Sequence, residues 1–316
     1  MSRETEKVLK ELQQFLALHE DEIADEDGLS RAANRFLEEY GGYGQKRENT
    51  APETADDYLE LAEQAPSRKK RLEYLRKAVE LKPEHVDAQL QLIAHTLEDK
   101  PDEQLPALRK LMETAAEPLE REGCFREDIG DFWTILETRP YMRVRQAYLD
   151  ALIACGMIRC AINEGEELLR LCENDNLGIR YQLMHLYAYM EDEMHALALH
   201  KRFDSYEETQ MLLPLAVLYY KLNQFDRAKD HIKRLAAVNK DTKKFLRAAA
   251  GNRLDRFFLD VNPYGYQPFT VEELMEDVMA SAYLFASVPH FFQWASDCLR
   301  TPSAAGRKKA GAKKQP

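Results

Sequence analysis

The sequence feature that most constrains the fold is a helix, turn, helix unit that recurs between residues 137 and 240. Small residues mark the recurrence, because Ala161, Ala196 and Ala228 come one after another at intervals of 35 and 32 residues. Gly156 stands five residues before the first of these alanines. A repeat of about 20 to 50 residues is typical of solenoids and other arrays. The pattern predicts helical hairpins that each bury an apolar side against the next.

Composition agrees with a helical chain. The 316 residues include 31% charged residues and only 13 glycines, in stretches rich in Ala, Leu, Glu, Lys and Arg. These residues favour helix over sheet, so we expect an all-α fold. The net charge of −11 argues against a protein that coats nucleic acid over its whole surface, since phosphate is bound by Lys and Arg.

The chain divides into three predicted segments. Residues 1–48 contain two amphipathic helices and are expected to form an N-terminal helical hairpin, which a Gly- and Pro-rich stretch separates from the next segment. Residues 49–300 are expected to form an α-solenoid. Residues 301–316 have no apolar face and are expected to be a disordered basic tail, with five cationic side chains: Arg307, Lys308, Lys309, Lys313 and Lys314.

Several helix ends can be predicted. A helix is expected to stop before Pro83, with the next one starting near Val86. Thr138 is expected to be the N-cap of a helix that has proline in its first turn. Thr270 and Glu273 have the spacing of a capping box. Towards the C-terminus the pattern predicts helices over 241–250, 271–287 and 289–299.

The recurring unit resembles the tetratricopeptide repeat (TPR), a pair of helices in about 34 residues. The match is good around Ala228 and looser around Ala161 and Ala196. The phrases ETRPYMR (137–143) and NDNLGIRY (174–181) also look like a bacterial group of TPR-like proteins of uncharacterised role. The resemblance covers roughly half of the chain and implies a right-handed α-solenoid. Around Ala228 it is carried by Leu212, Leu215, Ala216, Tyr219, Ile232 and Leu235.

In the TPR fold the first helix of each hairpin lines a concave groove that binds partners. Transferred to this chain, the resemblance implies that the groove is lined by Arg143, Gln146, Asp150, Tyr181, His185, Tyr189, Gln210, Leu213, Val217, Tyr220 and Lys221. Tyrosines supply large contact areas at low entropic cost, which suits peptide binding. The alternative is that Tyr181, Tyr189 and Tyr220 pack on a neighbouring helix, and that His185 is structural. The Lys and Asn clamp with which some TPR proteins bind a terminal carboxylate is absent.

Three arginines crowd one helix start, at Arg139, Arg143 and Arg145. They can form a basic rim for an acidic partner or a phosphate. They can also form ion pairs that fix the connector to the first repeat, and this second interpretation is favoured because exposed charges usually find local partners.

No motif for catalysis, metal or cofactor is found. The sequence contains no phosphate-binding glycine loop, no GxSxG and no HExxH. His195 and His200 miss the i, i+4 spacing of a helical metal site, and the five cysteines include no CxxC pair. No stretch is apolar for long enough to span a membrane, and no signal peptide opens the chain. We therefore expect a cytoplasmic protein that is not an enzyme.

The resulting functional prediction is a non-enzymatic scaffold or adaptor that binds a peptide or helix of an unidentified protein in the TPR groove. The alternative is a nucleic-acid-associated regulator that uses its basic C-terminal tail, although nucleic acid is the less expected partner. The sequence leaves the partner and the oligomeric state open.

Overall fold

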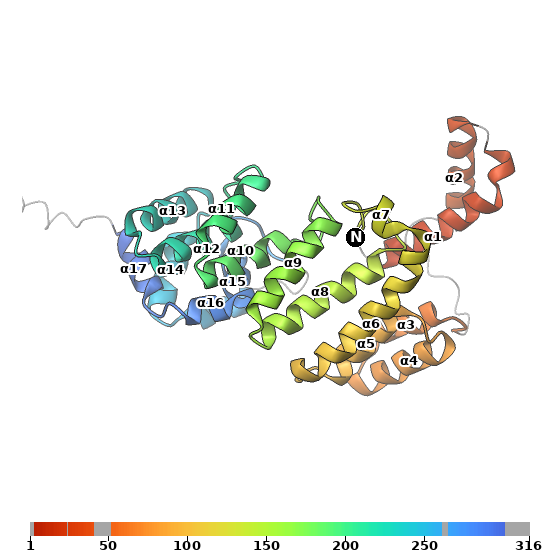
Figure 1. Ribbon diagram of the computed structural model, residues 1–316, viewed down its shortest axis with the longest axis horizontal. Helices are drawn as coiled ribbons and strands as arrows, with labels where there is room; N and C mark the ends of the chain where they lie inside the picture. Colours follow the sequence, from red (N-terminus) through yellow and green to blue (C-terminus); the bar gives the residue numbers. More distant parts are fainter. Residues whose placement is uncertain (1–2, 24, 41–51, 261–264, 301–316) are drawn as a thin grey trace, which may run out of the picture. The chain divides into compact units, whose positions relative to one another are not determined.

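The described part of the chain is helical throughout. The computed structural model describes residues 3–23, 25–40, 52–260 and 265–300, and these ranges contain 17 α-helices, two short 3-10 helices and no β-strand (Figure 1). The predicted all-α class is confirmed. Packing divides the chain into two compact units, residues 1–155 and residues 156–316, and each is described by itself.

The first unit begins with the predicted N-terminal hairpin. Phe15 of its first helix packs against Phe36 of its second, with ring centroids 5.5 Å apart. The helices of this unit are α1 (Arg3–Leu18), α2 (Glu26–Tyr40), α3 (Ala55–Glu63), α4 (Arg68–Leu81), α5 (Val86–Thr96), α6 (Pro101–Glu122), α7 (Cys124–Glu127) and α8 (Arg139–Ala154), and the 3-10 helix η1 (Glu20–Glu22) joins the first two.

Helices α3, α4 and α5 share a small apolar core. Ala62, Ala78 and Ala88 are completely buried there, because alanine lets neighbouring helices approach closely. Helix α4 ends at Leu81 and α5 begins at Val86, so the corner predicted at Pro83 is confirmed. Helix α5 packs in turn against α6 and α8.

The start of α8 differs from the prediction in one respect. Pro140 lies in the first turn as expected, but the Thr138 hydroxyl does not cap the helix. It donates instead to the carbonyl oxygens of Phe132 and Ile135 in the preceding connector. Thr138 is completely buried, so its hydroxyl needs an acceptor and finds one in the connector, which it ties to α8.

The second unit continues the helical chain. Its helices are α9 (Ile158–Leu171), α10 (Ile179–Met190), α11 (Glu193–Arg202), α12 (Thr209–Lys221), α13 (Phe225–Val238), α14 (Thr242–Ala250), α15 (Val271–Ala280), α16 (Ala282–Ala286) and α17 (Phe291–Cys298), with the 3-10 helix η2 (Leu254–Asp260) after α14. Helix α10 packs against α9, α11 and α12, and α12 packs against α13.

Small residues lie where the helices of the second unit meet. Ala161, Ala196 and Ala228 are each completely buried, as the repeat pattern predicts. Gly165 of α9 is closer still to its neighbour. A Cβ atom added there would lie 2.8 Å from Cδ2 of Leu183 on α10. The contact between α9 and α10 therefore has no space for a larger side chain at this position.

The C-terminal part contains one more break than predicted. The pattern predicts a single helix over 271–287, but α15 ends at Ala280 and α16 begins at Ala282. The Ser281 hydroxyl at the break donates to the carbonyl oxygen of Asp277, four residues earlier. Side chains that bond to their own backbone in this way compete with a regular helix.

The three predicted segments do not coincide with the two units. The division after Cys155 falls inside the array predicted over 49–300. The predicted boundary after residue 48 and the basic tail over 301–316 lie outside the described residues. The first predicted repeat contributes α8 to the first unit and α9 to the second.

Candidate interaction surfaces

The predicted groove residues lie on three helices. Arg143, Gln146 and Asp150 belong to α8 in the first unit. The remainder belong to α10 and α12 in the second unit, and the two sets are therefore treated separately.

Helix α10 is held at its start by Asp175, within the NDNLGIRY phrase. One oxygen of this buried carboxylate accepts from the backbone N–H of Ile179 at 2.6 Å, and the other accepts from that of Arg180 at 3.1 Å. The Arg180 guanidinium also donates to it, at 2.9 Å. Burial raises the pKa of Asp175, against the opposing effect of these bonds. Asp175 thus caps the helix that carries Tyr181, His185 and Tyr189.

Tyr181 is half-buried and tied to its surroundings. The Arg180 guanidinium carbon lies 4.2 Å from the centroid of its ring, a cation–π contact. Its hydroxyl donates to Glu208 at 2.9 Å. Burial is the main cause that raises the pKa of this phenol above its ordinary value. Tyr181 therefore offers one partly exposed ring in a fixed orientation.

His185 is a buried residue, 3% exposed. Its Nε2 lies 2.6 Å from Oδ1 of Asp277 on α15, whose side chain is completely buried. His185 is therefore a structural residue, because its contact with Asp277 joins α10 to α15 inside the unit. It does not line an open groove.

Tyr189 and Lys221 form the next contact along this face. The Tyr189 ring meets Tyr283 of α16 edge to face, with centroids 5.4 Å apart. Lys221 of α12 lies 5.1 Å from the centroid of the Tyr189 ring. Its ammonium donates to the carbonyl oxygens of Ala188 and Tyr189, at the C-terminal end of α10. A cation at the C-terminus of a helix is stabilising, so Lys221 acts as a cap for α10.

Tyr220 completes this face of α12. Its ring centroid lies 5.1 Å from that of Trp294 and 5.4 Å from that of Phe291, both on α17. Leu213 and Val217 are completely buried and belong to the core. Gln210 is 8% exposed and accepts from the Tyr266 hydroxyl at 3.4 Å. Helices α15, α16 and α17 thus occupy much of the face that the resemblance assigns to a partner.

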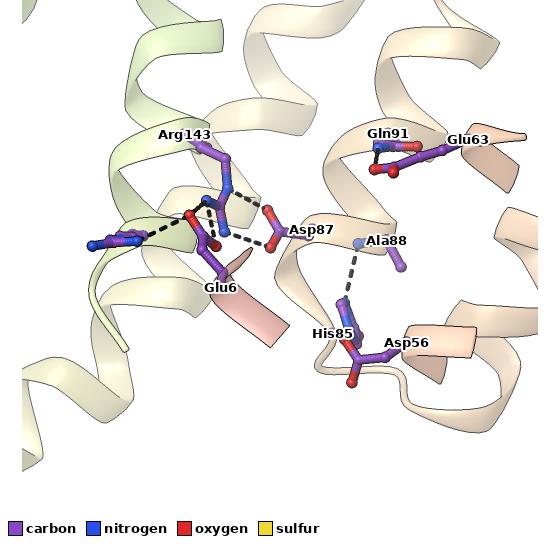
Figure 2. Close-up of polar contacts among 9 residues, drawn as sticks. Glu6, Asp56, Glu63, His85, Asp87, Ala88, Gln91 and Arg143 are labelled. Carbon is purple, nitrogen blue, oxygen red and sulfur yellow. Dashed lines mark hydrogen bonds and ion pairs between the residues drawn. The ribbon is translucent and has the colours of Figure 1, made fainter. Parts of the chain in front are cut away.

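In the first unit, Arg143 is the centre of a buried polar cluster (Figure 2). Its Nε and Nη2 donate to the two oxygens of Asp87 on α5, at 2.8 and 2.7 Å. Its Nη1 lies 3.0 Å from both oxygens of Glu6 on α1. Gln146 is half-buried and Asp150 is exposed on the same helix. The donors of the Arg143 guanidinium are therefore engaged within the first unit.

The neighbouring arginines take different partners. Arg139 lies one turn before Arg143, and its Nη1 is 3.3 Å from the Glu6 carboxylate. Its Nε donates to the Trp133 carbonyl oxygen at 2.7 Å. Arg145 donates to the Tyr141 hydroxyl at 3.2 Å. Arg139 bonds to the connector, as the favoured interpretation predicts, whereas the ion pairs of Arg143 join α8 to α5 and α1.

A second polar group in Figure 2 supports the start of α5. His85 accepts from the backbone N–H of Ala88 through Nδ1, at 3.1 Å, so the proton of its neutral ring is on Nε2. That nitrogen lies 3.1 Å from Asp56, and the hydrogen bond from His85 is the main cause that lowers the pKa of Asp56. This arrangement fixes the helix that presents Asp87 to Arg143.

Sequence reasoning missed the role of Glu6. The amphipathic pattern of residues 3–18 places Glu and Lys on the solvent side, yet Glu6 is 5% exposed. The signal available was a pair of arginines, one turn apart, that need carboxylate partners. Nothing local identifies those partners, because Glu6 lies 137 residues from Arg143 in the sequence.

Comparison with known proteins adds no identification. No protein-family model matches the chain, and no curated protein matches it. In the described ranges no helix is both long and apolar enough to cross a membrane. The same ranges contain no cluster of three or more His, Cys, Asp or Glu side chains placed to hold a metal ion.

Proposed function

We propose that the chain is a non-enzymatic interaction protein that binds a peptide or helix of a partner protein in the cytoplasm. In this proposal its hairpins stack as a right-handed solenoid of TPR-like repeats. The consecutive packing of α9 to α13 and the buried alanines at their contacts support the stacking. The five cysteines are free thiols, which is usual for proteins of reducing compartments.

The observation that carries the proposal is the contact between Arg143 and Glu6. The resemblance predicts that Arg143 contacts a partner. In the structure it binds a carboxylate on a helix that is remote in sequence. Hydrogen bonds from a guanidinium to a carboxylate are strengthened by the two charges, and arginine recognises acidic side chains in this way in many interfaces. The same pairing of charges suits a carboxylate on a helix from another protein.

The proposal assigns further partner contacts to predicted groove residues that reach the surface. Asp150 is exposed and Gln146 is half-buried on α8, and Tyr181 is half-buried on α10. The proposal does not use His185 or Leu213, which are buried within the second unit.

The test is co-purification of the tagged full-length protein from its native cells, with wild type compared with Asp150→Arg and Tyr181→Ala. A protein recovered with wild type should be depleted with one or both variants and should then bind the purified wild type directly. Glu113→Arg, on an exposed position of α6, is the matched control. Equal recovery of every protein with wild type and both variants would overturn the proposal.

A further inference from the structure

Arg139 and Arg143 converge on one carboxylate. They lie one turn apart on α8, and three contacts of 3.0 to 3.3 Å join their Nη1 atoms to Glu6. Figure 2 shows the Arg143 side chain between Glu6 and Asp87. The site is closed to water, because the side chains of Arg139 and Glu6 are 5% and 7% exposed and that of Arg143 is 15% exposed. A carboxylate in such surroundings is recognised strongly, since water does not compete for the donors.

The site is built to take a single carboxylate. One edge of the Arg143 guanidinium is held by Asp87, which leaves the Nη1 edge directed at Glu6. Asp87 also places a negative charge beside the ligand, with its side chain 10% exposed. A phosphate, which carries more charge than a carboxylate, would be repelled more strongly by Asp87. The geometry therefore favours the side chain of a glutamate over a phosphorylated residue or a nucleic acid.

The present occupant enters the site through this one side chain. Glu6 is the only buried residue among the α1 positions whose side chains are described. Val8, Leu12 and Phe15 remain partly exposed, and Phe15 is directed at Phe36 of α2. The apolar side chains of α1 are thus incompletely removed from water, and the helix gains less hydrophobic stabilisation than complete burial would supply. Glu6 is the side chain that anchors α1 to α8.

We propose that Arg139, Arg143 and Asp87 form a docking site for a glutamate on an amphipathic helix of a partner protein, and that α1 occupies this site within the same chain. The partner helix replaces α1, so the N-terminal helix is a competing internal ligand. This inference rests on the proposed function and specifies its partner as an acidic helix.

The test uses the full-length chain and a synthetic peptide of residues 3–18, with binding measured by titration calorimetry. The Glu6→Gln chain should bind the wild-type peptide about tenfold or more tightly than the wild-type chain does, because its own α1 competes less well. A peptide carrying Glu6→Gln should bind that chain about ten- to a hundredfold more weakly, since it lacks the charged acceptor. The chain with Glu38→Gln, an exposed position of α2, should behave as wild type.

A second variant isolates the arginine. Arg143→Lys in the Glu6→Gln chain keeps the charge but replaces the planar guanidinium with an ammonium, which cannot keep the forked bonds to Asp87 together with the bonds to a glutamate. This substitution should lower the affinity of the chain for the wild-type peptide to the affinity measured for the Glu6→Gln peptide. Should Glu6→Gln prevent folding, Glu6→Asp retains the charge on a shorter side chain and should give the same order of affinities.

Equal affinity of the two peptides for the Glu6→Gln chain, or no binding of either, would overturn the inference. That failure is distinct from failure of the proposed function, which appears as unchanged recovery of co-purified proteins. A chain that recovers a partner but does not discriminate between the peptides retains the proposed function without this site.

Discussion

Arg143 on α8 and Asp87 on α5 form a forked ion pair, with Nε 2.8 Å from Oδ1 and Nη2 2.7 Å from Oδ2. The pair joins two helices of the first unit, and its two residues are 56 positions apart in the sequence. Both side chains are largely removed from water. Loss of Asp87 would leave Arg143 with the Glu6 carboxylate as its charged partner, whereas loss of Arg143 would leave the buried Asp87 carboxylate without its forked donors.

Asp87→Asn should lower the free energy of unfolding of the first unit by about 1–3 kcal/mol, because two donors of Arg143 lose their charged acceptor while Glu6 still balances its charge. The double variant Asp87→Asn with Arg143→Met should be less destabilised than the sum of the two single variants. Urea unfolding, followed by hydrogen exchange of α5 and α8, measures both effects. Glu113→Gln, on an exposed position of α6, should change neither the free energy of unfolding nor the hydrogen exchange of α5 and α8. Additive effects of the two substitutions would contradict the direct interaction.

Gly165→Ala should destabilise the second unit by about 1–3 kcal/mol through overpacking. Alanine favours helix more than glycine does, so helix propensity alone predicts the opposite sign. The clash is with Leu183, at 2.8 Å from the added Cβ. Thermal unfolding measures the change, and Asn163→Ala at an exposed position of α9 is the control. A more stable Gly165→Ala protein would show that the contact relaxes without cost.

Lys221→Met should weaken the end of α10. The ammonium bonds to the Ala188 and Tyr189 carbonyl oxygens, and its side chain is 11% exposed. Hydrogen bonds from charged groups contribute about 1.5–3 kcal/mol, and the methionine stem retains the apolar packing. Hydrogen exchange should accelerate in the last turn of α10, with little change in α14. Lys243→Met, on an exposed position of α14, should leave α10 unaffected.

Glu273 gives the second unit a pH dependence. Its carboxylate accepts from the Thr209 hydroxyl and the Phe269 N–H, both at 2.7 Å, and burial is the main cause that raises its pKa. A raised pKa in the folded state means that the folded state binds the proton more tightly than the unfolded state. This contribution to stability is present below the unfolded pKa and is lost as the pH rises through the folded pKa.

Glu273→Gln keeps an oxygen acceptor and removes the titration. The free energy of unfolding of this variant should therefore rise relative to wild type as the pH increases above about 4, the ordinary glutamate pKa. Urea unfolding at several pH values measures the difference. The free energy of unfolding of Glu276→Gln, on an exposed position of the same helix, should change with pH as that of wild type does. A constant difference for Glu273→Gln across this range would exclude the carboxylate as the source.

Local patterns were sufficient for much of the fold. The repeat spacing located Ala161, Ala196 and Ala228, and all three are buried at helix contacts. Pro83 correctly marked the corner between α4 and α5. The corner depends on residues within one or two turns, and the alanines on a hairpin-length pattern that recurs along the chain. Neither signal requires knowledge of which distant segments pack together.

The candidate surfaces were harder to predict because their partners are distant in sequence. His185 bonds to Asp277, 92 residues away, and Arg143 bonds to Glu6, 137 residues away. The resemblance supplied positions along α10 and α12, but it contained no information on where the C-terminal helices pack. Tyr189 and Tyr220 consequently adopt the packing alternative, in contact with Tyr283 and Trp294.

The chain contains two tryptophans, and each unit has one. The ring of Trp133 lies against Arg139, with 5.5 Å between its centroid and the guanidinium carbon, whereas the ring of Trp294 packs on Tyr220. Indole emission is sensitive to nearby charge and to solvent, so the two units carry separate intrinsic fluorophores. Departure of α1 would alter the light emitted from Trp133 and leave that of Trp294 unchanged, which makes the native protein its own optical sensor for events at the arginines.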